Sequence, residues 1–191
     1  MKIAVIGKGN VGSALERGFH KGGHDVRAVG REPDAIRTAG ASADVIVLAV
    51  PFGAIDDVVR ALGDTPRGKV LVDVTNPLTA DLKLAVGFTT SGAEELQKKV
   101  PSARVVKAFN TVFAGQMDNA SAKGKRLSVF VASDDAAAKK AAMDLARSIG
   151  FDPVDAGPLQ NARHIEPLAF LNIQLAYVLG MGADIGFSLL H

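Results

Sequence analysis

The sequence predicts an α/β protein: a doubly wound parallel Rossmann sheet forming a single domain with a C-terminal helical extension. Two observations predict this class: short runs that are apolar almost throughout, and amphipathic segments that alternate with them along the chain. Runs of the first kind are typical of parallel strands, which helices cover on both faces. At 191 residues the chain is long enough for one complete core. We expect the Rossmann portion over residues 1–157 and the extension, packed on the same domain, over residues 158–191.

The apolar runs place the strands. In chain order these are residues 2–7, 25–30, 44–50, 69–75, 104–109, 127–133 and 151–156. Pro153 lies in the last run. Because proline cannot donate to a strand ladder, that strand is expected at the edge of a sheet.

Apolar spacing and capping signals place the helices between the strands. In chain order we expect them from about Val11 to the glycine pair at 22–23, between the second and third strands, over residues 55–62, from a capping box at Ser91 and Glu94, and over residues 135–149.

The C-terminal extension carries more apolar surface than one sheet edge needs. Its helix starts at Asn161 and breaks at residues 180–182, before a last short helix. Its apolar stripe consists of Ile165, Leu168, Leu171, Leu175 and Val178, and Phe187, Leu189 and Leu190 continue it. An exposed patch of this kind usually marks a partner, so we expect a two-fold homodimer with the last helices near the interface. The alternative is a helix folded onto its own sheet.

The composition narrows the classes of function. A formal charge of +2, with the basic residues scattered, gives no reason to expect nucleic acid. The absence of cysteine excludes disulfides, thiolate metal sites and thiol catalysis, and we expect no metal. The chain runs from Met1 straight into a strand, which leaves no room for a signal peptide, and its longest apolar stretch, residues 168–182, is too short to span a bilayer. We expect a cytoplasmic protein with no membrane partner.

A glycine pattern after the first strand predicts a dinucleotide site. The pattern G-x-G-x-x-G is formed by Gly7, Lys8, Gly9, Asn10, Val11 and Gly12, and it opens the first helix, which is the context that the motif requires. Glycines there allow a tight turn, a close approach of the backbone to a pyrophosphate, and close packing of helix on strand. The N–H groups of the helix N-terminus and its partial positive charge would then face the phosphates.

The end of the second strand favours NADP over NAD. NAD-specific folds place an acidic residue there to bind the ribose hydroxyls, whereas this chain has Gly30 followed by Arg31. A guanidinium can hold a 2′-phosphate in a fork, and Lys8 could add a second cation. Glu32 is adjacent and opposes this interpretation, and the alternative is that Arg31 is an ordinary surface arginine.

No side chain stands out as a catalytic acid or base. The histidines are expected to be surface or packing residues; they are His20, His24, His164 and His191. Lys107 lies inside a strand and is interpreted as a snorkelling side chain. Two aspartate pairs, at residues 56–57 and 134–135, are interpreted as solvated turns or caps.

Four segments together resemble the NADP oxidoreductases that depend on coenzyme F420. They are "VGR" after the second strand, "AVPF" after the third, "VKAFNTVFA" after the fifth, and the tail "DAGPLQNARHIEPLAFLNI" with "GMG". The segments are also similar to the cytosolic reductase domain of the STEAP metalloreductases, and the resemblance spans nearly the whole chain. It implies a Rossmann domain that passes hydride between NADPH and a flat tricyclic acceptor, either deazaflavin or flavin.

The resemblance also implies roles for individual positions. Lys8, Gly9, Asn10 and Val11 would hold the phosphates; Gly30 and Arg31 the 2′-phosphate; and Val50, Pro51 and Phe52 would border the nicotinamide. Asn110, Thr111, Val112 and Ala114 would form the acceptor's floor, where Ala114 also borders the cofactor, and Gly157, Pro158 and Leu159 would form the wall. Asn110 could donate a hydrogen bond to the acceptor.

Three departures from the family leave the acceptor open. The archaeal F420 enzymes tend to have histidine where this chain has Asn110. The sequence "AFNT" of this chain is closer to that of the flavin-using metalloreductases. The family's lysine shortly after the arginine is replaced by residues 33–35, and no segment here matches the metalloreductase membrane domain. We therefore expect F420, FMN or FAD as a co-substrate.

The absence of a strong acid or base fits such a reaction, because hydride transfer between two rings mainly needs alignment and exclusion of water. We expect the pocket at the carboxyl ends of the first, fourth and fifth strands. Two alternatives stay open: an imine or ketone reductase completed by a partner subunit, and a non-catalytic NADP sensor. A third interpretation is that residues 108–115 merely join a strand to a helix.

Overall fold

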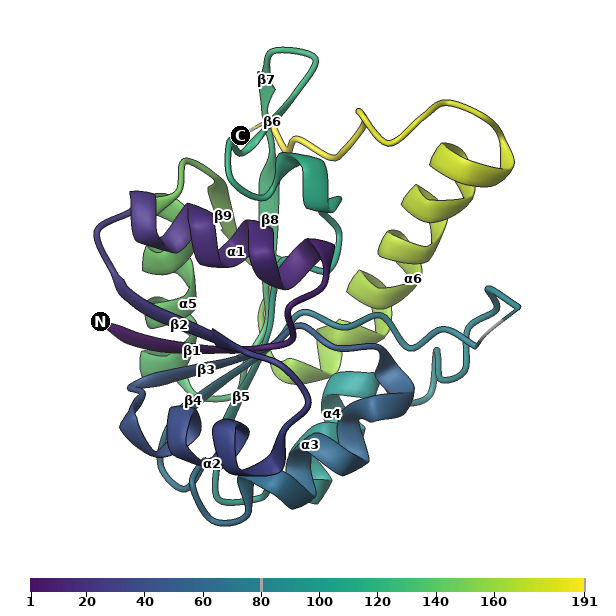
Figure 1. Cartoon of the computed structure of the whole chain (residues 1–191). Helices are drawn as coiled ribbons and strands as arrows, with labels where there is room; N and C mark the ends of the chain where they lie inside the picture. Colours follow the sequence, from purple (N-terminus) through teal and green to yellow (C-terminus); the bar gives the residue numbers. More distant parts are fainter. Residues whose placement is uncertain (80, 191) are drawn as a thin grey trace.

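The computed structural model describes residues 1–79 and 81–190, and its centre is a five-stranded parallel sheet (Figure 1). The strands follow the order β2-β1-β3-β4-β5. They are β1 (Lys2–Ile6), β2 (Asp25–Val29), β3 (Val45–Leu48), β4 (Val70–Asp73) and β5 (Arg104–Lys107). The order reverses beside β1, which is the arrangement of a doubly wound sheet, so the predicted fold class is confirmed.

Two further strands extend this layer beyond β5. β8 (Ser128–Val131) and β9 (Asp152–Asp155) pair in parallel with each other. Ala132, just after β8, exchanges two backbone hydrogen bonds with Lys107 of β5, at 2.9 and 3.0 Å. Pro153 lies in β9, which pairs with β8 alone among the described strands, as expected for a sheet edge.

Helices cover both faces of the sheet (Figure 1). On one face, α1 (Asn10–Lys21) and α5 (Ala136–Ser148) enclose a core in which Phe19, Phe109 and Phe151 meet edge to face. On the other face, a second core lies under α2 (Pro33–Ser42), α3 (Ile55–Leu62) and α4 (Gly92–Lys99). These helices match the predicted ones. None of the helices in the described residues is long and apolar enough to cross a membrane.

The predicted caps are present. The Ser91 side chain accepts a hydrogen bond from the Glu94 N–H at 3.1 Å at the start of α4. Asp135 caps α5 by accepting from the Ala138 N–H at 2.8 Å. Asp135 of the predicted pair is therefore a helix cap, whereas Asp134 accepts from the Leu159 N–H at 3.0 Å.

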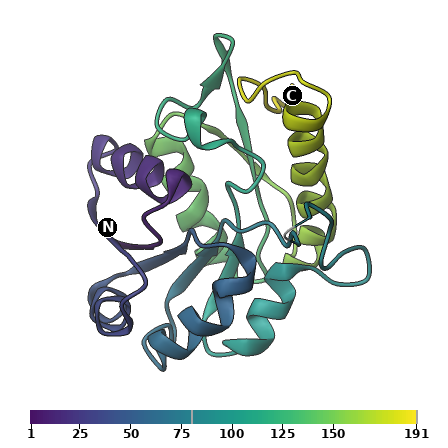
Figure 2. The same ribbon diagram turned by 45° about the vertical axis from the view of Figure 1, so that its right-hand side comes forward.

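The C-terminal extension begins with a short turn, η3 (Leu159–Asn161), and continues as α6 (Ala162–Ile173) and a π-helical turn, η4 (Gln174–Val178). The prediction of a last short helix is wrong. After the glycines the chain turns back as irregular structure, and the Phe187 carbonyl accepts from the Ser128 N–H at 2.8 Å (Figure 2). The tail thus satisfies a backbone donor at the start of β8, which a helix would leave without this partner.

Small and polar side chains, rather than the predicted stripe, form most of the buried side of α6. The buried positions of α6 and η4 are Ala162, Ile165, Glu166, Ala169, Asn172 and Ala176. Leu171 is 50% exposed and Val178 is 61% exposed. Of the predicted stripe, only Ile165 is fully buried, and the surface left outside continues onto Leu179 and Met181.

The remaining elements are short. They are the turns η1 (Phe52–Ala54) and η2 (Ala114–Gln116) and the hairpin of β6 (Ser121–Ala122) and β7 (Lys125–Arg126). Both turns lie beside the site described next.

Candidate functional site

The turn between β1 and α1 can be built only with glycine. Gly7 has φ +119°, and a Cβ on it would lie 2.1 Å from the Ala49 carbonyl oxygen. A Cβ on Gly12 would lie 2.0 Å from the Gly7 oxygen, so the glycine lets α1 pack closely on the turn. Around Gly9, by contrast, there is open space within 4 Å. The chain is tight on the inside of this turn and accessible on the outside.

The N-terminus of α1 is suited to an anion. Gly9 is its N-cap residue, so no side chain satisfies the first N–H groups, and its first turn contains no acidic residue. A helix start of this kind carries a partial positive charge and unsatisfied donors. The residues present therefore fit a pyrophosphate, as the glycine pattern predicted.

Three cavities adjoin along the carboxyl edge of the sheet. The first, which we call the β2 cavity, has a volume of about 650 Å³ and shares Val50 and Pro51 with a second. This second, central cavity has about 280 Å³ and shares Asn10, Val11 and Asn76 with a third, the α6 cavity, of about 480 Å³. The shared residues place the three cavities side by side past the glycine turn, and we call the three together the crevice.

The β2 cavity combines an apolar slot with cations. Arg31, Arg37 and Arg60 line it, together with Gly30, Pro33, Ile36, Val50, Pro51, Gly53, Ala54, Asp57, Val58 and Ala61. Arg60 pairs with Asp57 at 2.8 Å. Within the described residues, Arg31 and Arg37 have no carboxylate within ion-pair distance, so their charge is available to a ligand.

Sequence reasoning placed Gly30 and Arg31 in this region and missed Arg37 and Arg60. Arg37 lies on α2 and reaches the Ala61 carbonyl of α3 at 3.4 Å, a contact that depends on how the two helices pack. The Glu32 carboxylate folds back over Gly30. A Cβ on residue 30 would lie 2.7 Å from Glu32 Oε2. Gly30 therefore makes room for the acidic neighbour beside the cavity.

The central cavity lies at the carboxyl ends of β1, β3 and β4. Its lining is Gly9, Asn10, Val11, Ala49, Val50, Pro51, Phe52, Val74, Thr75 and Asn76. The segment expected to border a nicotinamide, residues 50–52, is thus brought next to the glycine turn by the fold. Phe52 is half-buried at the start of η1.

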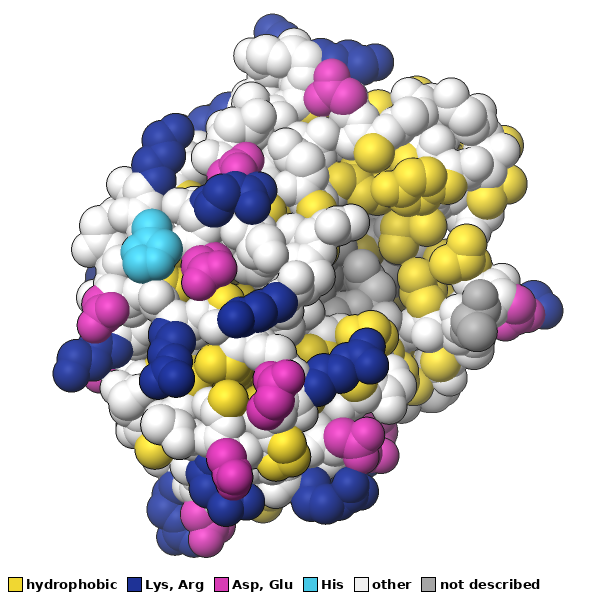
Figure 3. Space-filling view, viewed as in Figure 1, with side chains coloured by type: hydrophobic (Ala, Val, Ile, Leu, Met, Phe, Trp, Pro, Cys, Tyr) yellow, Lys and Arg dark blue, Asp and Glu magenta, His cyan; other side chains and the backbone are white. Residues whose placement is uncertain are grey.

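The α6 cavity is neutral. It is lined by Asn10, Val11, Asn76, Leu82, Asn110, Thr111, Val112, Phe113, Ala114, Ala169, Asn172, Ile173 and Tyr177. Among these described residues there is no charged side chain, and the polar groups are amides and hydroxyls. Tyr177 meets Phe113 edge to face, with ring centroids 5.6 Å apart. Figure 3 shows apolar side chains gathered around a hollow on this side of the molecule.

The floor of the α6 cavity contains the segment that the sequence singled out, from Asn110 to Ala114. The geometry changes the role expected for Asn110. Its Nδ2 donates to Asn76 Oδ1 at 3.0 Å and to the Ile165 carbonyl at 3.3 Å, which uses both N–H bonds. Its Oδ1 has no partner among the described residues. Asn110 therefore has an acceptor, rather than a donor, left unpaired.

Residues 157–159, the predicted wall, are not among the described residues that line the three cavities, and their role stays a prediction. Gly157 accepts from the Ser133 N–H at 3.2 Å, beyond β8 and β9. Leu159 is 2% exposed and packs in the core beneath α3 and α4. The side opposite the floor is formed by α6, through Ala169, Asn172 and Ile173.

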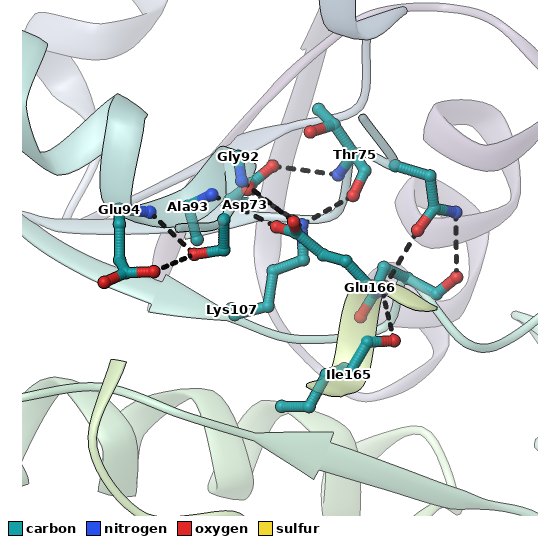
Figure 4. Close-up of polar contacts among 11 residues, drawn as sticks. Asp73, Thr75, Gly92, Ala93, Glu94, Lys107, Ile165 and Glu166 are labelled. Atoms are coloured by element: carbon teal, nitrogen blue, oxygen red, sulfur yellow. Dashed lines mark hydrogen bonds and ion pairs between the residues drawn. The ribbon is translucent and has the colours of Figure 1, made fainter. Parts of the chain in front are cut away.

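Lys107 does not snorkel; it is completely buried in an ion triad (Figure 4). Its Nζ lies 2.9 Å from Asp73 Oδ2 and 2.9 Å from Glu166 Oε1. Burial lowers the pKa of Lys107, but attraction to the two carboxylates and the hydrogen bonds to them outweigh burial, so the pKa lies above its usual value. Asp73 and Lys107 lie side by side in register on neighbouring strands, which the sequence alone does not reveal.

The three histidines that the structure describes lie at the surface or in packing positions, as expected. His20 and His164 are exposed, and His24 is half-buried beside Ser148 Oγ, 3.0 Å from its Nε2. Burial, and then the charge of the N-terminus, lower the pKa of His24. His191 lies outside the described residues. In the described part of the chain no three His, Asp or Glu side chains are grouped so that they could hold a metal ion.

Comparisons with known proteins agree with this geometry. The family described as NADP oxidoreductase, coenzyme F420-dependent, matches residues 2–42 and 37–77. The F420-dependent NADP reductase of Methanothermobacter thermautotrophicus is 32% identical over 92% of this chain and 89% of its own. The rat metalloreductase STEAP3 is 32% identical over 87% of this chain, which spans about a third of that protein (36%).

A solved structure matches the whole chain. It is that of a putative F420-dependent NADP reductase from Arthrobacter sp. FB24, with a TM-score of 0.91, 32% identity and 100% coverage of both chains. The doubly wound sheet and the glycine turn are those of a dinucleotide-binding protein. The chain belongs to the family of NADP oxidoreductases dependent on coenzyme F420, and is an NADP-dependent oxidoreductase.

Proposed function

We propose that the chain transfers hydride between NADP(H) and a flat flavin-like ring, either the deazaflavin of coenzyme F420 or FMN or FAD. The observation that supports this most strongly is the order of the three neighbouring cavities: a cationic slot, a cavity at the start of α1, and a neutral cavity. When bound, NADPH supplies the hydride. The protein's residues bind, align and shield the two rings.

In this proposal the nucleotide occupies the β2 and central cavities. The residues from Gly7 to Gly12 receive the pyrophosphate at the start of α1. Arg31, next to Gly30, binds the 2′-phosphate. Arg37 lines the same cavity and supplies a second cation there, in a chain that lacks the family's lysine after Arg31. Residues 50–52 then border the nicotinamide, and Ala114 lies on the other side of the ring, in the α6 cavity.

The acceptor ring lies in the α6 cavity on the segment from Asn110 to Ala114. Its neutral lining suits a planar ring and offers no cation to anchor a carboxylate substrate. Asn110 Oδ1 would accept a hydrogen bond from an N–H group of a ligand. Complete reduction of such a ring takes up the hydride and one proton, and no acid in the cavity is needed if water supplies the proton.

We also propose that the chain works as a homodimer through the outer face of α6. Leu171, Tyr177, Val178, Leu179 and Met181 are each half or more exposed there, which supports an interface. Light scattering at micromolar concentration measures this directly, and a monomer would contradict it. The cytoplasmic location stays a prediction.

A panel of acceptors tests the proposed function. Purified protein with NADPH should reduce at least one of the F420 deazaflavin, FMN and FAD. Turnover of a cyclic imine or a ketone, but of none of these rings, would favour the small-molecule reductase. NADPH binding without turnover of any acceptor would favour the sensor.

A further inference from the structure

The ion triad around Lys107 connects three elements of the fold. Lys107 on β5 contacts Asp73 on β4 and Glu166 on α6, and its Nζ also donates to the Thr75 carbonyl at 2.6 Å (Figure 4). The three ionised side chains are all 0–1% exposed. Asp73 Oδ1 accepts in turn from the Thr75 N–H at 2.9 Å. The charges are therefore fully enclosed and hydrogen-bonded.

Glu166 brings in a fourth element. Its Oε2 accepts from the Gly92 N–H at 2.8 Å and its Oε1 from the Ala93 N–H at 3.1 Å, both in the first turn of α4. A carboxylate at a helix N-terminus is stabilised by the free N–H groups and the helix dipole. One side chain of α6 is thus held by the ammonium of Lys107 and by the start of α4.

The triad lies behind the α6 cavity. The Thr75 carbonyl that Lys107 holds precedes Asn76, which lines both the central and the α6 cavities. On α6, the residue before Glu166 is Ile165, whose carbonyl receives the Asn110 amide. Farther along α6, Asn172 Nδ2 donates to the Thr111 carbonyl at 3.1 Å. The floor and the α6 side of the cavity therefore both depend on elements that the triad holds.

A second ion pair joins the same two helices without reaching the cavity. Arg163 of α6 binds both carboxylate oxygens of Glu94 on α4, at 2.9 and 2.7 Å, and both side chains are partly exposed. If the triad served only to attach α6 to α4, this pair would do the same work. A buried triad is costly to desolvate and is weak evidence for stability, so a geometric role accounts for it better.

We propose that Glu166 and Lys107 are positioning residues for hydride transfer: they hold α6 against the ends of β4 and β5 and so set the shape of the acceptor cavity. This inference rests on the proposed acceptor site. It requires that loss of the Glu166–Lys107 contact affects the acceptor far more than the nucleotide. Thr75, whose carbonyl Lys107 holds, lines the central cavity, but none of the triad residues is among the described residues that line the β2 cavity, where the 2′-phosphate is proposed to bind.

The test compares Glu166→Gln with Glu94→Gln. Both changes remove one carboxylate charge between α4 and α6, but only the first removes it from Lys107. For Glu166→Gln we expect the KM of the acceptor to rise about tenfold or more, with a smaller change in kcat. For Glu94→Gln we expect both constants within about twofold of the parent. The Kd of NADPH, measured by its fluorescence, should change less than about threefold in both, because the 2′-phosphate is proposed to bind in the β2 cavity, at a distance from the triad.

A second measurement needs no acceptor. The chain has a single tyrosine and no tryptophan, so its intrinsic fluorescence reports Tyr177, which lines the α6 cavity. Tyr177 is 63% exposed and its ring meets Phe113. In ligand-free protein, Glu166→Gln should therefore change the acrylamide quenching of Tyr177, and Glu94→Gln should not. If the parent protein reduced none of the rings, the proposed function would be wrong. The quenching of Tyr177 would still show whether Glu166 and Lys107 set the shape of the α6 cavity.

Two results would overturn the inference. One is a Glu166→Gln variant that binds NADPH normally and keeps the parent's acceptor KM and Tyr177 quenching. The other is equal loss of NADPH and acceptor binding, which would indicate general damage. Should Glu166→Gln fail to fold, the triple variant Asp73→Asn, Lys107→Met, Glu166→Gln leaves no unpaired buried charge, and the same rise in acceptor KM is expected from it.

Discussion

The β2 cavity carries Arg31, Arg37 and Arg60 on its wall, whereas the α6 cavity, at the other end of the same crevice, offers only amides and hydroxyls as polar side chains. The second region is not poor in charge, since Lys107, Asp73 and Glu166 lie directly behind it. There, however, every charge is paired inside the protein. The arginines of the β2 cavity are open to a ligand, which indicates a phosphate site. The charges behind the α6 cavity neutralise one another and leave a neutral surface, which suits a planar ring.

The largest expected effect comes from filling the neutral end. Ala114→Trp should lower acceptor turnover at least 100-fold, because the indole would take the place of the ring. The Kd of NADPH should change less than about threefold, since Arg31, which is proposed to bind the 2′-phosphate, does not line the α6 cavity with Ala114. Ala114 is half-buried and lines the cavity, so a tryptophan there can extend into the cavity without entering the core. Val112 is 7% exposed, so Val112→Trp would also overpack the core. A variant that kept full turnover would contradict the pocket.

A smaller effect is expected at the charged end. Arg31→Ala should weaken NADPH binding by about 10- to 100-fold, the equivalent of roughly 1.5–3 kcal/mol for a charge-assisted contact. NADH binding should stay nearly constant, and the unmodified protein should bind NADPH at least tenfold more tightly than NADH. Titration of both nucleotides measures the effect. Equal affinities in the parent would show that the arginines do not select the phosphate.

The smallest effect concerns stability and pH at the surface pair between α4 and α6. The Arg163 hydrogen bond lowers the pKa of Glu94 below its usual value. Because the pKa of Glu94 is lower in the folded state, the pair contributes its full stabilisation above the unfolded pKa of about 4.5. That stabilisation is lost as the pH falls through the folded pKa. At pH 7, Glu94→Gln should lower Tm by about 1–3 °C.

Thermal melts of the parent and this variant from pH 7 to pH 3 check the point. The difference in Tm should vanish in acid. For Lys107, whose pKa is raised, the sign is opposite: its contribution is present below the unfolded pKa of 10.5 and is lost only above it. Melts between pH 7 and pH 9 should therefore show no loss from the triad.

Much of the fold could be predicted because it depends on local patterns. Apolar runs gave the strands, capping residues gave the helix starts, and the glycine pattern gave the turn at the crevice. The segment from Asn110 to Ala114 lies beside the crevice because it directly follows β5, whose carboxyl end faces that edge. Its role as the acceptor's floor stays a prediction.

What could not be predicted depends on contacts between distant segments. Lys107 looks like a snorkelling lysine until its register with Asp73 and the position of α6 are known. Residues 157–159 follow a strand, as the floor segment does, but β9 lies at the far edge of the sheet, and Leu159 packs in the core beneath α3 and α4. The tail after the glycines is extended because it satisfies the start of β8, a partner that no local pattern reveals.

The central claim is that the central and α6 cavities hold the two rings next to each other, so that hydride passes directly between them. NADPH carrying deuterium at the transferred position of the nicotinamide tests this with F420 as acceptor. The deazaflavin accepts hydride at a ring carbon, where the label does not exchange with water. Direct transfer predicts one deuterium on that carbon in the reduced product, with a primary isotope effect on the step. Label found in water, or a reduced product without deuterium, would contradict the account.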